Sequence, residues 1–135
     1  MLDMVAFVEK QNAVESPDDL HQIRYIILEA KTGKPLGAVD LYEIDWEKES
    51  AYVGILIAET SKRKMGAGLQ ALVKVIDQAS ETFDLDLVKA RIFPDNIASQ
   101  KLFLKAGFIK SDKKLESVNS DYFEFYYDIK EKENG

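Results

Sequence analysis

Two glycines and three consecutive basic residues form the part of the sequence best suited to hold an anion. Lys62, Arg63 and Lys64 precede Gly66 and Gly68, and an apolar pattern of helical spacing follows. Glycine has no Cβ, so the backbone N–H groups beside it can approach a ligand closely. The N-terminus of the following helix adds donors and a positive dipole end. A pyrophosphate is the natural ligand, although such turns also occur without one. The loop has neither the Gly-Lys-Ser/Thr of a P-loop nor the spacing of a dinucleotide fingerprint.

The residue types that the chain lacks exclude several kinds of chemistry. There is no cysteine, and His21 is the single histidine. A disulfide framework, a thiolate nucleophile, a Ser-His triad and a multi-histidine metal site are therefore not expected. The 18 basic and 24 acidic residues give a net charge of −6, which disfavours nucleic acid as a partner. We expect a single cytoplasmic domain over residues 1–135, with no membrane span and no metal.

The spacing of the apolar residues predicts an α/β fold around the glycine loop. The helix after the loop carries Leu69, Leu72 and Ile76 on one face and polar residues on the other, a pattern typical of an amphipathic helix. The other predicted elements, in chain order, are a short helix over 3–11 in an N-terminal helical segment 1–22, strands over 23–30, 36–44 and 51–58, a strand over 87–93, a helix over 97–105, a strand over 122–129 and a frayed tail over 130–135.

A second motif lies one helix and one strand after the glycine loop. It begins at Phe93, continues through Asn96, and ends at Gly107 and Phe108. Gly107 sits where a helix needs a left-handed residue to end, and Phe108 can fold back onto that helix.

Together, the two motifs resemble the signatures of the GNAT acetyltransferases. Arg63-x-x-Gly66-x-Gly68 resembles their Gln/Arg-x-x-Gly-x-Gly/Ala, and the run over 96–108 resembles their Asn…Leu-Tyr-x-Lys-x-Gly-Phe. Residues 37–45 are similar to a strand of the branch that holds the ribosomal-protein N-terminal and spermidine acetyltransferases. The resemblance covers residues 23–108. It implies a mixed, largely antiparallel central sheet flanked by helices, with a shortened N-terminal part.

The resemblance also implies a site for acetyl-CoA. The loop amides would hold the pyrophosphate, and the end of the third strand would pair with the pantetheine arm. The strand over 87–93 would diverge from the third strand and admit the thioester. Asn96 serves equally well as a helix cap, and Leu56 and Ile57 as core. The implied cofactor-binding residues are Leu56, Ile57, Ala58, Arg63, Lys64, Met65, Gly66, Ala67, Gly68, Asn96, Ser99 and Phe103.

Direct acetyl transfer needs a base for the amine and an acid for the leaving thiolate. Phe103 occupies the position where many family members carry a tyrosine acid, and a phenyl ring has no proton to give. Ser99 is the substitute we expect, unless it only completes a capped helical turn. The candidate bases are Tyr52, Glu43 and Asp45. Because the ordinary pKa of tyrosine is far above neutral, Tyr52 would act through a water.

Three function classes remain open from the sequence. The first is an N-acetyltransferase that acts on a small-molecule or peptidyl amine. The second is a GNAT-like module that binds acyl-CoA without transferring the acyl group, which Phe103 and the 22 residues before Ile23 favour. The third is an interaction domain that binds another phosphate. Trp46 either walls the acceptor pocket or covers a core edge, and the aromatic residues over 122–127 predict core packing together with a homodimer face.

Overall fold

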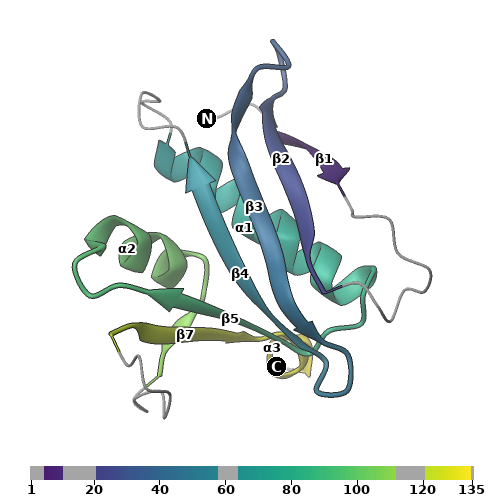
Figure 1. Cartoon of the computed structure of the whole chain (residues 1–135), viewed down its shortest axis with the longest axis vertical. Coiled ribbons are helices and arrows are strands. Elements are labelled where there is room, and N and C mark those ends of the chain that lie inside the picture. Colours follow the sequence, from purple (N-terminus) through teal and green to yellow (C-terminus); the bar gives the residue numbers. More distant parts are fainter. Residues whose placement is uncertain (1–4, 11–20, 58–63, 112–120, 135) are drawn as a thin grey trace.

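The computed structural model describes residues 5–10, 21–57, 64–111 and 121–134. Within these ranges, seven strands form one sheet in the order β1-β2-β3-β4-β5-β7-β6 (Figure 1). Neighbouring strands are antiparallel except β4 and β5, which are parallel. The elements are β1 (Val5–Lys10), β2 (Ile23–Glu29), β3 (Pro35–Asp45), β4 (Ser50–Ile57), α1 (Lys64–Glu81), β5 (Leu87–Ile92), α2 (Ile97–Lys105), β6 (Ile109–Lys110), β7 (Phe123–Asp128) and α3 (Ile129–Asn134).

One face of the sheet carries the core. Side chains alternate between the faces of a strand, and the buried residues of neighbouring strands are in register, as in the pair Tyr25 and Val39 and the pair Leu41 and Val53. Helix α1 lies behind β3 and β4 in Figure 1. It buries a stripe at helical spacing, in which each buried leucine, isoleucine or valine side chain contributes about 1.5–3 kcal/mol and each alanine less. This stripe consists of Ala67, Ala71, Leu72, Val75, Ile76 and Ala79.

The other face of the sheet, here called the polar face, carries charged and aromatic side chains at the alternate positions. Arg24 of β2 forms an ion pair with Asp40 of β3. Tyr42 and Tyr52 are register partners on β3 and β4, and Lys89 of β5 is the register partner of Tyr52. Tyr52, one of the predicted acceptor-side residues, therefore lies on the face opposite α1.

Two predictions for the ends of the chain are wrong. Val5–Lys10 is not helical but forms strand β1, which pairs with β2 over six residue pairs. A short apolar run fits either period, and pairing with an exposed strand edge decides in favour of the strand. Ile129–Asn134 is not frayed but forms α3. Its first turn is capped by the Asp128 carboxylate, which accepts a hydrogen bond of 2.9 Å from the Glu131 N–H.

Candidate active site

Strands β4 and β5 pair only at one end. Their register partners are Ser50–Leu87, Ala51–Val88 and Tyr52–Lys89, and beyond Tyr52 the two strands separate, as Figure 1 shows. We call these diverging segments, Val53–Ile57 and Ala90–Ile92, the fork. The divergence predicted for the strand after the amphipathic helix is thus present. Within the fork β5 does not pair with β4, so that side of the β4 backbone can pair with an extended ligand.

The tip of β4 borders this opening with both exposed and buried side chains. Leu56 is 75% exposed, whereas Ile57 is only 7% exposed. The alternative that both residues are core therefore holds for Ile57 and fails for Leu56. The sheet is also tight here, because a Cβ at Gly37 of β3 would lie 2.0 Å from the Leu56 carbonyl oxygen. Ala58 lies outside the described residues.

Part of the predicted glycine loop is helix. Helix α1 begins at Lys64, so Lys64, Met65 and Gly66 form its first turn, where backbone N–H groups have no partner within the helix. Gly68 lies further in and is buried, and a Cβ at this position would be 2.9 Å from Leu102 Cδ2. The missing Cβ of Gly68 therefore serves the packing of α1 against α2, and the contact of its amide with a ligand stays a prediction. Ala67 is likewise in the core, and Arg63 lies outside the described residues.

The residues at the start of α2 form a cap. The Asn96 side-chain oxygen accepts a hydrogen bond of 3.1 Å from the Ser99 N–H, so the interpretation of Asn96 as a helix cap is confirmed. Asn96 is exposed and Ser99 is half-buried, which leaves both able to meet a ligand. Their roles toward the cofactor and the thiolate stay predictions.

The end of α2 places Phe103 in the core. Gly107 has a left-handed φ of 104°, and the Phe108 N–H donates to the Phe103 carbonyl at 3.0 Å, as in a Schellman motif. The Phe103 and Phe108 rings meet edge to face, with centroids 4.9 Å apart. The predicted helix end is confirmed. Since Phe103 is only 3% exposed, it could touch a cofactor only with its few exposed atoms.

The three candidate bases lie in different surroundings. Tyr52 is 8% exposed, and its ring stacks on that of Tyr42 with centroids 5.7 Å apart. Burial raises the pKa of Tyr42, and the nearby Arg91 acts in the opposite direction. Asp45 accepts a hydrogen bond of 3.0 Å from the Lys48 N–H, so it closes the turn between β3 and β4.

Glu43 is brought to the fork by an irregularity in β3. The pairing of β3 with β4 shifts register between Tyr42 and Asp45, and Glu43 within this bulge has a φ of 47°. Regular alternation would turn Glu43 away from the face that carries Tyr42, but a bulge can redirect a side chain. The Glu43 carboxylate instead forms an ion pair with Arg91 of β5. Tyr52 and Glu43 are thus brought together, and Asp45 is not.

Arg91 is the functional candidate that sequence reasoning missed. Its guanidinium lies 3.7 Å from the centroid of the Tyr52 ring. Burial disfavours its charge, but the hydrogen bond and charge of Glu43, together with Tyr52, keep the pKa of Arg91 above its ordinary value. The alternation along β5 placed Lys89 and Arg91 on one face, but no local pattern showed that Arg91 reaches a carboxylate 48 residues away.

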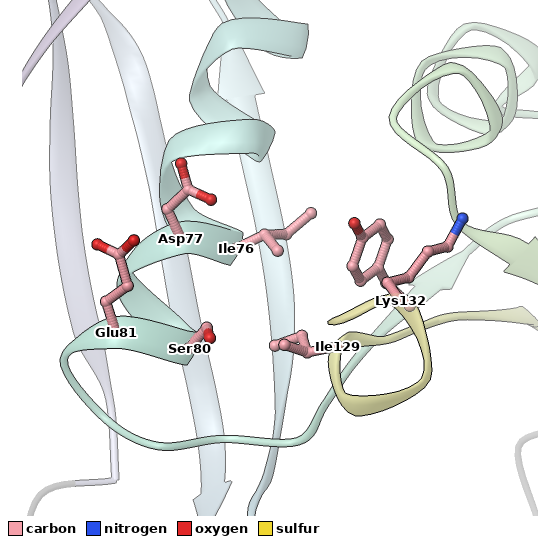
Figure 2. A pocket seen from close by; sticks show the side chains of 7 residues that line it. Ile76, Asp77, Ser80, Glu81, Ile129 and Lys132 are labelled. Atoms are coloured by element: carbon pink, nitrogen blue, oxygen red, sulfur yellow. The ribbon is translucent and has the colours of Figure 1, made fainter. Parts of the chain in front are cut away.

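Two other features lie away from the fork. Trp46 packs against Phe83 with ring centroids 6.1 Å apart, so it covers a core edge, as one of its two interpretations proposed. A cavity of about 240 Å³ lies between α1, β7 and α3 (Figure 2). It contains none of the predicted site residues and is lined by Ile76, Asp77, Ser80, Glu81, Tyr127, Ile129 and Lys132.

Two kinds of feature are missing from the described ranges, a membrane-spanning helix and a cluster of metal-binding side chains. None of the helices placed there has the length and apolar character needed to cross a membrane. Likewise, among the side chains of those ranges, no group of three or more histidines and carboxylates is arranged to hold a metal ion.

Comparisons with known proteins agree with this geometry. No curated protein matches the sequence. The chain is similar to the dodecameric structure of spermidine N-acetyltransferase from Vibrio cholerae in an intermediate state, with 21% identity and a TM-score of 0.73 over 86% of this chain and 70% of that one. The same enzyme in complex with CoA and spermine gives 21% identity and a TM-score of 0.69 over 79% of this chain and 65% of that one.

A third solved structure is assigned as a ribosomal-protein-serine acetyltransferase from Vibrio cholerae. It gives 21% identity and a TM-score of 0.69 over 80% of this chain and 64% of that one. In two of these three comparisons the chain thus spans just under two thirds of its neighbour. The family model described as the acetyltransferase (GNAT) domain matches residues 3–109. This chain therefore belongs to the GNAT acetyltransferase family.

Proposed function

We propose that the chain transfers an acetyl group from acetyl-CoA to a primary amine by direct attack within a ternary complex. The observation that carries this proposal is the fork, because β4 stops pairing with β5 after Tyr52. Acetyl-CoA supplies a thioester carbonyl that an amine can attack. The proposed cytoplasmic location fits this co-substrate. The transfer of an acetyl group to an amine is the activity typical of the family.

The described residues fit such a cofactor. Along the fork, β4 offers a backbone edge that an extended pantetheine chain can pair with, and the exposed Leu56 offers apolar surface beside it. The first turn of α1, at Lys64, Met65 and Gly66, supplies N–H donors and a positive dipole end for a pyrophosphate. We also assign Asn96 and Ser99, at the start of α2, to the cofactor site. Arg63 and Ala58 are assigned to it from the family resemblance alone.

The acceptor side would lie on the polar face. Tyr52 is the preferred base, acting through a water, since the Glu43 carboxylate is already paired with Arg91. Ser99 would return a proton to the leaving thiolate. We keep the acceptor as a small-molecule or peptidyl amine. One structural neighbour was determined with spermine and one is a dodecamer, which supports an amine acceptor and assembly of this chain into homo-oligomers.

The second candidate is a module that binds acyl-CoA without transferring it. Phe103 supports it, since this buried ring carries no proton at the position of the family's tyrosine acid.

Two measurements separate these functions. Calorimetry with acetyl-CoA and coenzyme A tests the cofactor site, and no binding at millimolar ligand would overturn both candidates. Release of free thiol is then followed with polyamines, aminosugars, and alanine- and serine-initiated peptides. Thiol release that depends on one of these amines supports transfer, whereas binding without release from the whole panel supports the non-catalytic module.

A further inference from the structure

Arg91 joins three strands at the fork. Its guanidinium forms an ion pair with Glu43 of β3 and lies over the ring of Tyr52 of β4 at 3.7 Å, a distance typical of a cation–π interaction. Arg91 lies two residues beyond the last β4–β5 pair, Tyr52–Lys89. Its side chain therefore connects strands at a place where the backbones of β4 and β5 no longer do.

Both partners of Arg91 are held in restricted positions. Glu43 has a φ of 47°, a left-handed conformation that is unfavourable for residues other than glycine and that persists only where the surroundings maintain it. Tyr52 has Tyr42 stacked on it and Lys89 4.6 Å from its ring centroid. A guanidinium is planar and always charged, so it can bind a carboxylate and cover an aromatic face at once.

The geometry points to Arg91 as a positioning residue that fixes Tyr52 and Glu43 at the fork, and with them the place where the acceptor amine meets the thioester. This inference rests on the proposed function and extends it. In this arrangement Glu43 holds Arg91 rather than taking the proton of the amine. Arg91 itself need not touch either substrate.

The chain contains a matched control. Arg24 and Asp40 form an ion pair on the same face of the sheet, with an Nε–Oδ1 distance of 2.8 Å and an Nη2–Oδ2 distance of 2.9 Å. This pair joins β2 and β3, whose backbones are paired at the same two residues. Removing Arg24 therefore deletes a similar ion pair without affecting the fork.

The first measurement does not require activity. In protein carrying ¹³C-labelled tyrosine, Arg91→Gln should shift the ring signals of Tyr52 and Tyr42. Arg91→Lys should restore them in part, because it keeps the cation but loses the planar group. Arg24→Gln should leave them in place. If Arg91→Gln leaves the Tyr52 signals unmoved, Arg91 does not fix that ring and the inference is overturned, whether or not the chain transfers acetyl groups.

The second measurement uses the amine that the panel identifies. Arg91→Gln should lower kcat/KM for the amine by about tenfold to a hundredfold, since small displacements at a reacting centre cost rate on this scale. The Kd for acetyl-CoA should stay within about twofold, and Arg24→Gln should match the wild type. Shifted tyrosine signals with unchanged kinetics would overturn the role of Arg91 in the reaction. If the wild type binds acetyl-CoA but acetylates no amine, the proposed transfer is overturned. The tyrosine spectra would still show whether Arg91 fixes the Tyr52 ring.

Discussion

Gly68 of α1 lies so close to Leu102 of α2 that a Cβ at position 68 would be 2.9 Å from Leu102 Cδ2. Both residues are buried. The absence of a side chain at position 68 therefore sets the distance between the two helices whose N-terminal turns we assign to the cofactor.

The first prediction concerns this contact. Gly68→Val should lower the free energy of unfolding by about 1–3 kcal/mol, since a branched side chain must displace packed atoms. Gly68→Ala is the matched control. It gains about 1 kcal/mol of helix propensity, which offsets the displacement of the end of Leu102, so its stability should stay close to that of the wild type. Urea denaturation measures both. A valine variant as stable as the wild type would show that the helices can separate freely.

The second prediction separates the two roles of Asn96. Asn96→Ser keeps a side-chain oxygen that can accept from the Ser99 N–H, so stability should stay within about 0.5 kcal/mol, whereas Asn96→Ala should lose about 1 kcal/mol with the cap. If the Asn96 amide also contacts acetyl-CoA, the serine variant should bind the cofactor several-fold more weakly despite its intact cap. Thermal denaturation measures the stability of each variant, and calorimetry measures its affinity for acetyl-CoA. Equal affinity in the serine variant and the wild type would restrict Asn96 to capping.

The third prediction tests Ser99 as the acid. Ser99→Ala removes the hydroxyl but keeps the backbone N–H that donates to Asn96, so the helix should remain capped. We expect kcat to fall by about a hundredfold, at the lower end of what a general acid contributes, with the Kd for acetyl-CoA unchanged. Steady-state kinetics with the amine found in the panel measures this. An unchanged kcat would mean that another group, or water, protonates the thiolate.

The fourth prediction concerns pH. Asp86 raises the pKa of Glu49 above its ordinary value of 4.5, first by a hydrogen bond between the carboxyl groups and then by its charge. Asp84 adds to this effect and Lys130 opposes it. Between the unfolded and the folded pKa the folded protein binds more protons than the unfolded chain, so this pair makes stability fall as pH rises through that window.

Glu49→Gln should remove this pH dependence. The variant should gain thermal stability relative to the wild type as pH rises from 4.5 toward neutral. Because Glu49 is at the surface, the gain should be small and should shrink with added salt. The measurement is the difference in Tm between variant and wild type at each pH. A difference that does not change with pH would contradict the raised pKa.

Local patterns predicted the elements that position the site. The helix over 97–105 was predicted with the bounds that α2 has, because its cap at Asn96 and its end at Gly107 are signalled within a few residues. Strands β2 to β5 lie within one residue of their predicted ends. The sequence predicted that the helix begins after the glycine loop, whereas α1 begins at Lys64. Two glycines in five residues indicate a loop, and the packing of α1 against α2 that requires Gly68 is not visible in the local sequence.

The rest depends on contacts distant in sequence. Strand β1 exists because β2 offers it an edge, and its own six residues do not decide between strand and helix. The ion pair of Glu43 with Arg91 needs a bulge in β3, the divergence of β4 from β5 and a left-handed glutamate. The bulge and the left-handed glutamate have no signal of their own in the sequence, and the divergence was expected only from the family resemblance. The contact of Glu43 with Arg91 could therefore not be predicted.

The three β4–β5 residue pairs at Ser50–Tyr52 also determine how the sheet can deform. The five residues from Val53 to Ile57 extend about 17 Å beyond the last of these pairs, at roughly 3.3 Å per residue. A change of about 5° in the angle between the strands at the closed end would displace the tip of β4 by about 1.5 Å over that length. The width of the opening is thus sensitive to small distortions at its base, where Ser50 and Leu87 form the first of the three pairs.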